Sequence, residues 1–411
     1  MSTRTPVREV VGGVDTHKDT HYAAVITTTG QHLGAAQFPT TSAGYEALIG
    51  FITSFGVLLR VGVEGTNSYG AGLTRRLDSA GITVLEVLQP GRRRQGTGGK
   101  SDEIDAYRAA ESALAQHHCA QPKNSQGLVE QLRVITITRA GAVSARAEAL
   151  TQISNILITA PEDLRERYRD VPTRRRLQLL GRIRCHDQDS AVVTTTKLTL
   201  KTLAKRIHSL SLEIDEHTET LERLITTTHP ALLQSRGIGV ISAAALLISA
   251  GDNPDRLTSE AQFAMHTGTA PIPASSGQTT RYRLNRGGDR KANHALHTIA
   301  IVRLHVCPRT RAYAAKRRSE GKSPKDILRC LKRAIAREIY HLLTTPPAYI
   351  DPAELRQLRL ESGCTLTQAA DTMGCSIAKL SCAERSLLND REFLSVYRAL
   401  LEQQATVQTA A

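Results

Sequence analysis

The sequence predicts an α/β domain at the N-terminus followed by a mainly helical remainder. From Val10 to Val87, short apolar runs alternate with turn residues, which is typical of strands joined by tight connections. From Gln126 to Thr228, strand signals are weak and apolar residues recur at helical spacing. At 411 residues the chain is much longer than the roughly 150 residues of an average domain, so we expect several cores.

The order of the predicted elements defines the N-terminal fold. Three strands are expected in VVGGVDTH, HYAAVITT and HLGAAQF, followed by a helix in GYEALIGFITSF and a buried strand in VLLRVGVEG. A helix near 69–80, a strand in ITVLEVL, a basic glycine-rich loop and a helix from about Asp102 complete the series. This βββαβαβα order is that of the ribonuclease H-like fold, in which the first and fourth strands are neighbours.

Four acidic residues fall at the ends of these elements. Asp15 and Glu64 lie in the first and fourth strands and are expected to meet at one mouth of the sheet, while Asp102 and Asp105 share a helix face. Because Mg²⁺ prefers oxygen ligands and converging carboxylates are tolerable around metal, the four acids predict a site for Mg²⁺ or Mn²⁺. Each acid taken alone is typical of a strand end or a helix cap.

The charge of the chain predicts a polyanionic partner. Lys and Arg number 53 against 39 Asp and Glu, giving a net charge of +14 that is spread over several segments. The alternative is a basic soluble protein without such a partner. The loop before Asp102 offers four cations beside the acids that can position phosphates: Arg92, Arg93, Arg94 and Lys100.

Cysteine usage and hydropathy predict a cytoplasmic protein. The seven cysteines form no Cys-x-x-Cys pair, which indicates reduced thiols and no structural zinc site. The most apolar stretch, 239–251, is shorter than the roughly 20 residues that span a bilayer, and the first ten residues lack a signal-peptide core. We expect no membrane partner.

Two helical features follow the N-terminal domain. The spaced apolar residues of 126–228 predict long paired helices, which serve either as a spacer or coiled coil or as an oligomerisation and nucleic-acid support. The run LLQSRGIGVISAAALL then places a Gly-x-Gly turn between two helical stretches, as in a helix-hairpin-helix. Such a turn can expose N–H groups to a phosphate, and it equally fits a simple tight turn.

A loop rich in Ser, Thr, Gly and Arg precedes a helix expected from near Asp289. Ser276, which precedes a glycine, is a candidate nucleophile. Five cations in this region can stabilise charge on an attacked phosphate: Arg281, Arg283, Arg286, Arg290 and Lys291. The alternative is a solvated phosphate-binding loop without a covalent role.

The segments GVDTHKDTH, VGVEGTNSYG and GKSDEIDAYRAA resemble the RuvC-like domain of the DEDD insertion-sequence transposases, which are bridge-RNA-guided recombinases. The resemblance places the family tetrad on Asp15, Glu64, Asp102 and Asp105. The serine loop is similar to the C-terminal domain of the same family, in which a serine before glycine attacks DNA. It assigns that role to Ser276, with Ser275 as the alternative.

The likeness runs from about Val11 to about Leu343 and includes long stretches similar to actinobacterial members. GTAPIP departs from the more usual Gly-Leu-Ala-Pro beside the serine loop.

Beyond Pro346 and Pro347, four or five short helices resemble a Cro/C1-type helix-turn-helix, with Thr367 as an N-cap and Gly374 in the turn. Its second helix would present four side chains to a major groove, namely Ser376, Lys379, Ser381 and Arg385. Because few of these read bases, a degenerate fold used for dimer contacts is the alternative.

The predicted domains are a RuvC-like domain (1–122), a long helical region (123–228), a serine transposase domain (229–345) and a helix-turn-helix tail (346–411). The resemblance implies a Mg-dependent recombinase that exchanges strands through a serine-phosphodiester. It also implies donor and target DNA, a noncoding bridge RNA and a homodimer or homotetramer. The alternatives are a RuvC-like endonuclease that only hydrolyses, an actin-like ATPase or sugar kinase, and a non-catalytic regulator that binds DNA through its tail.

Overall fold

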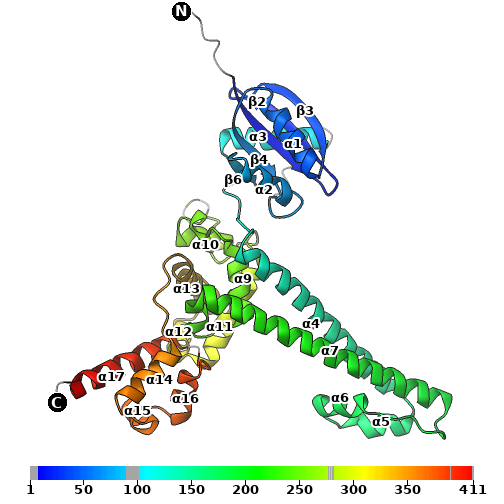
Figure 1. The fold of residues 1–411 in the computed structure, drawn as a ribbon, viewed down its shortest axis with the longest axis vertical. Coiled ribbons are helices and arrows are strands. Elements are labelled where there is room, and N and C mark those ends of the chain that lie inside the picture. The colour runs from blue at the N-terminus through cyan, green and yellow to red at the C-terminus, as the bar shows by residue number, and fades with distance from the viewer. Residues whose placement is uncertain are drawn as a thin grey trace, which may run out of the picture. The chain divides into compact units, whose positions relative to one another are not determined.

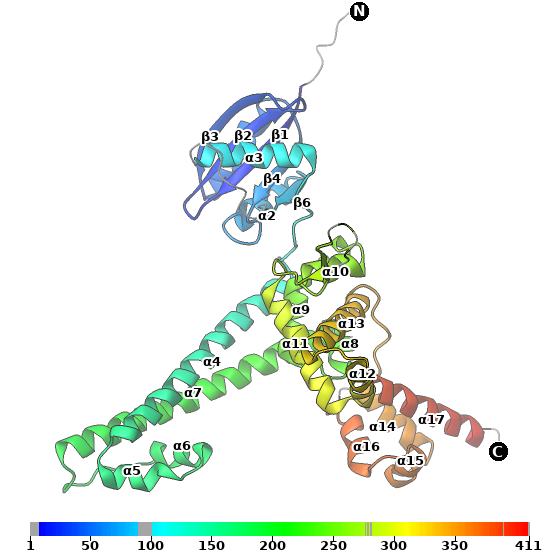
Figure 2. The ribbon, with the colours of Figure 1, turned by 180° about the vertical axis from the view of Figure 1, so that it is seen from behind.

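The computed structural model describes residues 8–88, 101–275, 277, 279, 282–388 and 390–409. The chain divides after Ser125 into two compact units, each with its own core. Figure 1 shows the ribbon of the chain and Figure 2 the same ribbon from behind.

The first unit is built on a six-stranded sheet with the order β3-β2-β1-β4-β5-β6. Strands β1, β2 and β3 form an antiparallel meander, β4 runs parallel to β1, and β5 runs parallel to β4. The predicted adjacency of the first and fourth strands is therefore confirmed. The strands are β1 (Glu9–Thr16), β2 (Thr20–Thr27), β3 (His32–Pro39), β4 (Val57–Glu64), β5 (Val84–Val87) and β6 (Cys119–Ala120).

Helices cover both faces of this sheet. Figure 1 looks onto α1 (Ser42–Thr53) and Figure 2 onto α3 (Asp102–Ala115), which lies across the opposite face; α2 spans Ala71–Ser79. Buried Val10, Val14 and Leu48 belong to the core on the α1 side, whereas Val11 and Ala110 belong to the smaller cluster under α3.

Glycines allow α3 to approach the sheet closely. A Cβ on Gly13 would lie 2.2 Å from the carbonyl oxygen of Ala106, and one on Gly62 would lie 2.4 Å from that of Ala109. Real Cβ atoms do not tolerate such distances, so the backbone of α3 rests directly on β1 and β4 at these two points. This contact brings the first turn of α3 to the edge where β1 and β4 end.

The second unit begins with two long helices, α4 (Leu128–Thr159) and α7 (Ala191–Thr228), which pack along each other as their apolar spacing predicts. Two short helices that were not predicted, α5 (Glu162–Arg169) and α6 (Thr173–Gly181), pack near the far end of this pair (Figure 1). Buried Tyr168, Leu180 and Leu200 form their shared core. One or two amphipathic turns carry too few repeats for a helix period to be read from sequence.

The largest core of the second unit lies among α9, α10, α11 and α13, where Phe263, Leu296 and Ile339 are fully buried. The segment predicted as irregular contains a two-residue ladder, because β7 and β8 pair antiparallel. The elements are α8 (Pro230–Gln234), α9 (Val240–Ala250), a 3-10 turn (Pro254–Arg256), α10 (Glu260–His266), β7 (Ile272–Pro273), β8 (Tyr282–Arg283), α11 (Arg290–Val306), α12 (Pro308–Ser319) and α13 (Pro324–Thr344).

The tail contains α14 (Pro352–Glu361), α15 (Leu366–Thr372), α16 (Ile377–Glu384) and α17 (Arg391–Thr409). A buried polar network joins three of them: Arg359 donates to Glu384 at 2.6 Å, and the Tyr397 hydroxyl donates to the same carboxylate at 2.7 Å. Removing one charged partner would leave an uncompensated buried charge, so the network links α14, α16 and α17 energetically.

The predicted cap of the second tail helix is wrong by two residues. The N-cap of α15 is Thr365, whose hydroxyl accepts from the Gln368 N–H while the Gln368 side chain accepts from the Thr365 N–H. Thr367 lies inside the helix. The reciprocal capping box needs a Glu or Gln three residues after the cap, and only Thr365 has one. Gly374 occupies the turn as predicted, with φ of +59°.

Candidate active site and nucleic-acid surfaces

The ends of β1 and β4 place Asp15 and Glu64 at the same edge of the sheet. Val14 pairs with Val63 in this parallel ladder, so the acids that follow them occupy adjacent positions. Both lie two residues beyond a glycine that touches α3, and side chains alternate along a strand, so both belong to the α3 face. The Thr16 hydroxyl donates to the carbonyl oxygen of Glu64 at 2.9 Å and ties the two strand ends together.

The first turn of α3 brings further carboxylates to this edge. Ser101 caps the helix by accepting from the Ile104 N–H at 3.3 Å, and Asp102, Glu103 and Asp105 occupy the first turn. Acidic residues there are stabilised by the helix dipole. Asp102 is exposed, whereas Asp15 is buried. The charge of Asp102 is therefore tolerated both by the helix dipole and by solvent.

The structure brings together Asp15, Asp102 and a residue that the sequence analysis did not single out, His17. Its Nδ1 atom lies 3.7 Å from Asp15 Oδ2, and its Nε2 atom lies 3.9 Å from Asp102 Oδ1. One ligand atom from each of the three lies within 4.8 Å of the others. The available signal was the spacing Asp15-Thr-His17, since residues two apart share a face at a strand end.

The other two members of the predicted tetrad are held differently. Asp105 accepts a hydrogen bond from Arg108 at 3.0 Å, one helical turn away. Neither Asp105 nor Glu64 belongs to the three-residue group found among the described residues. Arg108 contacts Asp105 through the Oδ1 atom. The grouping of all four acids around one centre therefore stays a prediction.

The donor set at this edge fits a divalent cation. Carboxylate oxygens dominate it, and oxygen donors are the ligands of Mg²⁺ and Mn²⁺, while an imidazole nitrogen is acceptable to Mn²⁺. The glycines under α3 set the distance between Asp15 and Asp102 through rigid elements rather than through loops.

Several predicted residues lie outside the described part of the chain. They are Arg92, Arg93, Arg94, Lys100, Ser276 and Arg281. Near the predicted nucleophile, Ser275 is exposed and Gly277 adopts a positive φ of +57°. The remaining cations of this region, Arg283, Arg286, Arg290 and Lys291, are all exposed.

The two ends of the serine loop meet at a closed neck, formed by Gly268 and Gly288. A Cβ on Gly288 would lie 2.2 Å from the Gly268 nitrogen, so the two ends of the loop touch through their backbones. Asn285 donates to the Met265 carbonyl oxygen at 2.9 Å, and the Asp289 N–H donates to that of His266 at 2.7 Å. These contacts fix the two ends of the segment between Gly268 and Gly288 against each other.

A polar cluster lies beneath that neck. Ser249, which is buried, lies within hydrogen-bond distance of His266, 3.0 Å from its Nε2 atom. Burial opposes ionisation of Asp289, but hydrogen bonds from Ser249 and from the N–H groups of Ala292 and Lys291 outweigh it and lower the pKa of this carboxyl. Asp289 thereby stays charged as the cap of α11.

The predicted Gly-x-Gly turn connects α8 and α9. Gly237 has φ of +81°, and a Cβ there would lie 2.9 Å from Arg303 Cγ. Arg303 donates to the Arg236 carbonyl oxygen at 2.6 Å and forms a two-pronged ion pair with Glu338. The first glycine thus serves the turn and its packing on α11. Nothing lies within 4 Å of a Cβ at Gly239, the cap of α9, so phosphate binding there stays a prediction.

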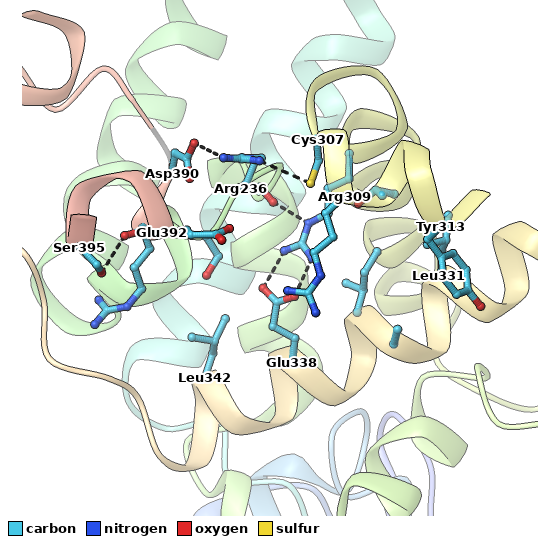
Figure 3. Close-up of a pocket in the computed structure, with 16 residues that line it drawn as sticks. Arg236, Cys307, Arg309, Tyr313, Leu331, Glu338, Leu342, Asp390, Glu392 and Ser395 are labelled. Atoms are coloured by element: carbon cyan, nitrogen blue, oxygen red, sulfur yellow. Dashed lines mark hydrogen bonds and ion pairs between the residues drawn. The ribbon is translucent and has the colours of Figure 1, made fainter. Parts of the chain in front are cut away.

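The tail is joined to the rest of the second unit beside this turn. Figure 3 shows Arg236 between Asp390, with which it forms an ion pair, and Cys307, whose sulfur accepts from it at 3.5 Å. They line a cavity of about 660 Å³ together with residues of α12, α13 and α17. Burial raises the pKa of Cys307, but hydrogen bonds from Thr310 and Arg236 outweigh it and lower that pKa.

Within the tail, the two cations predicted to face DNA differ in their contacts. The Lys379 ammonium lies 3.9 Å from the centroid of the Phe393 ring, so it is engaged with α17. Arg385 is exposed and donates to the Ser381 carbonyl oxygen at 3.2 Å. Ser376 caps α16 by accepting from the Lys379 N–H. The structure therefore leaves Arg385 better placed than Lys379 to meet a phosphate.

Two family models match the chain, and both describe transposases. A transposase model of the DEDD type matches residues 12–160, and the model of the transposase IS116/IS110/IS902 family matches residues 229–315. The first range contains the acidic edge and the second contains the serine loop. The chain is therefore an enzyme of the transposase class.

Curated relatives agree with these matches. The chain is 25% identical to the insertion element IS900 uncharacterized 42 kDa protein of Mycobacterium paratuberculosis, across 82% of this chain and 99% of that protein. It is 30% identical to the insertion element IS110 uncharacterized 43.6 kDa protein of Streptomyces coelicolor, across 36% of this chain and 38% of that protein. The chain belongs to the IS110 family of transposases.

No helix in the described part of the chain is long and apolar enough to cross a membrane.

Proposed function

We propose that this transposase is a site-specific recombinase that breaks and rejoins DNA through a serine-phosphodiester intermediate at a metal-dependent, ribonuclease H-like (RuvC-like) centre. The observation that carries the proposal is the approach of Asp15 and Asp102 from two separate elements at the edge where β1 and β4 end. Glu64 ends the neighbouring strand and Asp105 lies on the same helix turn, so the tetrad implied by the family resemblance falls in one region.

The acids would hold Mg²⁺ or Mn²⁺. A divalent cation bound there supplies stabilisation of the negative charge that develops on an attacked phosphate. The protein contributes the positioning: Thr16 fixes the strand ends, and Gly13 and Gly62 fix α3 above them. Asp105 would bind the cation through one carboxylate oxygen while Arg108, which is exposed, neutralises the other or turns to the DNA backbone.

Ser276 would be the nucleophile, with Ser275 as the alternative. Attack forms a bond between the serine oxygen and phosphorus and breaks one P–O bond of the strand; the serine loses its proton and the released hydroxyl gains one. Because the phosphodiester is retained, the reverse reaction with a new strand needs no external energy. Exposed Arg283, Arg286, Arg290 and Lys291 would stabilise the developing charge.

The partners would be donor DNA, target DNA and a noncoding bridge RNA. The active assembly would be a homodimer or homotetramer in which the acids of one subunit combine with the serine of another. It would act in the cytoplasm. The net charge of +14 supports nucleic-acid binding, and the guide RNA rests on the family resemblance alone. The tail would act in targeting or autoregulation as a helix-turn-helix, with Arg385 on its exposed surface.

The experiment combines full-length protein with its flanking element RNA, donor DNA, target DNA and Mg²⁺. We expect a protein–DNA adduct on a denaturing gel, with the modified serine mapped by mass spectrometry. Ser276→Ala should abolish the adduct and cleavage together, and Ser275→Ala should retain both. Cleavage that persists in Ser276→Ala without an adduct would instead establish a hydrolytic nuclease.

A further inference from the structure

We propose that His17 is a direct ligand of the cation at the acidic edge, and that its imidazole gives this site a preference for Mn²⁺ over Mg²⁺. The inference rests on the metal-binding part of the proposed function. It adds a nitrogen ligand to a set that the family resemblance describes as carboxylates only.

The backbone holds His17 in place from both sides. It directly follows the last residue of β1, whose hydroxyl is tied to the end of β4. Its own N–H donates to the Thr20 carbonyl oxygen at 3.1 Å and closes the tight turn into β2. The imidazole is therefore carried by a rigid strand end, and it is 48% exposed, so an ion can reach it.

The three side chains are close enough to share one ion. Both ring nitrogens are too far from their nearest carboxylate oxygens, at 3.7 and 3.9 Å, for a hydrogen bond. Ligands bonded to one cation at about 2.1 Å lie roughly 3 to 4 Å apart, depending on whether they are adjacent or opposite. One oxygen of Asp15, one oxygen of Asp102 and one ring nitrogen of His17 lie within 4.8 Å of one another, so a small movement of these side chains around an ion brings them to such distances. Glu64, Asp105, solvent and a phosphate oxygen would complete the coordination sphere.

The identity of the ligand decides which ion is favoured. Mg²⁺ is a hard ion that prefers oxygen ligands, whereas imidazole nitrogen suits transition-metal ions. A site that contains a nitrogen ligand therefore binds a transition-metal ion such as Mn²⁺ more tightly than it binds Mg²⁺. A site of carboxylates alone discriminates little between Mg²⁺ and Mn²⁺. One nitrogen donor raises the affinity for Mn²⁺ without a matching gain for Mg²⁺.

The competing explanation is that His17 is only a cationic partner of the two carboxylates. The two roles make opposite predictions. A ligand that is removed weakens Mn²⁺ binding, whereas a competing positive charge that is removed leaves it unchanged or strengthens it. The sign of the change in affinity therefore separates them without reference to enzyme activity.

The test is titration of the full-length protein with Mn²⁺ and Mg²⁺ by calorimetry. We expect His17→Ala to weaken Mn²⁺ binding about 10-fold or more and Mg²⁺ binding much less, and His17→Asp to restore affinity while removing the preference for Mn²⁺. His32→Ala is the matched control, because His32 in the same unit is 50% exposed and also lies beside a carboxylate, that of Glu111. It should bind both ions as the wild type does.

A spectroscopic measurement on the same samples identifies the bond directly. Pulsed electron paramagnetic resonance of the Mn²⁺ complex should show coupling to a bonded nitrogen in the wild type and His32→Ala, and none in His17→Ala. Unchanged or tighter Mn²⁺ binding in His17→Ala, or nitrogen coupling that survives it, overturns the ligand assignment. Failure of the wild type to bind Mn²⁺, or unaltered binding by Asp15→Asn, would instead refute the metal site of the proposed function.

Discussion

His21 is a buried side chain that contributes to the pH dependence of its domain's stability. It is fully buried on β2, and its ring stacks on that of Tyr45 with centroids 5.7 Å apart. Burial disfavours the charged imidazolium and lowers the pKa of His21. The unfolded chain therefore binds a proton more readily than the folded chain at mildly acidic pH.

The sign of the pH dependence follows from this difference. Above the ordinary histidine pKa of about 6.5, His21 is neutral in both the folded and the unfolded state and does not change the free energy of unfolding. As the pH falls below this value, the unfolded state gains protons and the free energy of unfolding declines, by at most about 1.4 kcal/mol per pH unit. Hydrogen exchange of the β2 amides, corrected for intrinsic rates, should show less protection at pH 5.5 than at pH 7.5. His21→Phe should flatten this change, and an equal change in the variant would contradict the explanation.

At the scale of elements, the position of α3 depends on two glycines in the strands beneath it. Helix and sheet approach at Gly13 and Gly62, where a Cβ would overlap the helix backbone. Asp102 and Asp105 are carried on this helix, whereas Asp15 and Glu64 are carried on the strands. The distance between the two pairs of acids is thus a property of helix-on-sheet packing.

Gly13→Ala should therefore separate the acids. The added methyl would lie within 2.2 Å of the Ala106 carbonyl oxygen, so α3 must move away. We expect the free energy of unfolding to fall by a few kcal/mol, with a lower melting temperature. Calorimetry should detect no cation binding. The control is Gly50→Ala on α1, where nothing lies within 4 Å and alanine favours a helix by about 1 kcal/mol. Normal cation binding by Gly13→Ala would show that α3 is not held by this contact.

Elements were predictable in proportion to their length. Strands β1 to β4 and helices α4 and α7 repeat their apolar period several times, so their type and order follow from sequence. Strands β6, β7 and β8 have two residues each and exist because a partner strand lies beside them. Asp15 and Asp102 were predictable from sequence motifs, whereas His17 was not, because only the turn into β2 brings its ring between them.

At the scale of the whole molecule, the tail is attached to the transposase core of the second unit by specific contacts. Asp390 pairs with Arg236, Gln234 donates to the Ile350 carbonyl oxygen, and Arg391 donates to that of Ala348. Arg236 also belongs to the turn between α8 and α9 and contacts Cys307. The tail is thereby linked to the same segment that carries the Gly-x-Gly turn.

Asp390→Asn should loosen this attachment while leaving the helices folded. Asparagine keeps the hydrogen bond that Asp390 accepts from the Phe393 N–H at 3.3 Å, but it removes the charge facing Arg236. We expect limited proteolysis to release residues after Thr345 several-fold faster, with faster hydrogen exchange at the amides of 348–351. Glu402→Gln, which alters an exposed ion pair with Arg398, is the control. Equal release rates for the two variants would mean that the Arg236 pair does not hold the tail.

The sequence by itself determined the α/β character of the N-terminal unit, the order of its strands, the long paired helices and the family, because periodicity, turns and motifs are properties of neighbouring residues. Only the tertiary structure decided that His17 faces Asp15 and Asp102, that Gly268 meets Gly288 at the neck of the serine loop, and that Arg236 holds Asp390. Each of these contacts depends on the packing of elements that are separated along the chain. Local sequence patterns do not determine the distance between such elements.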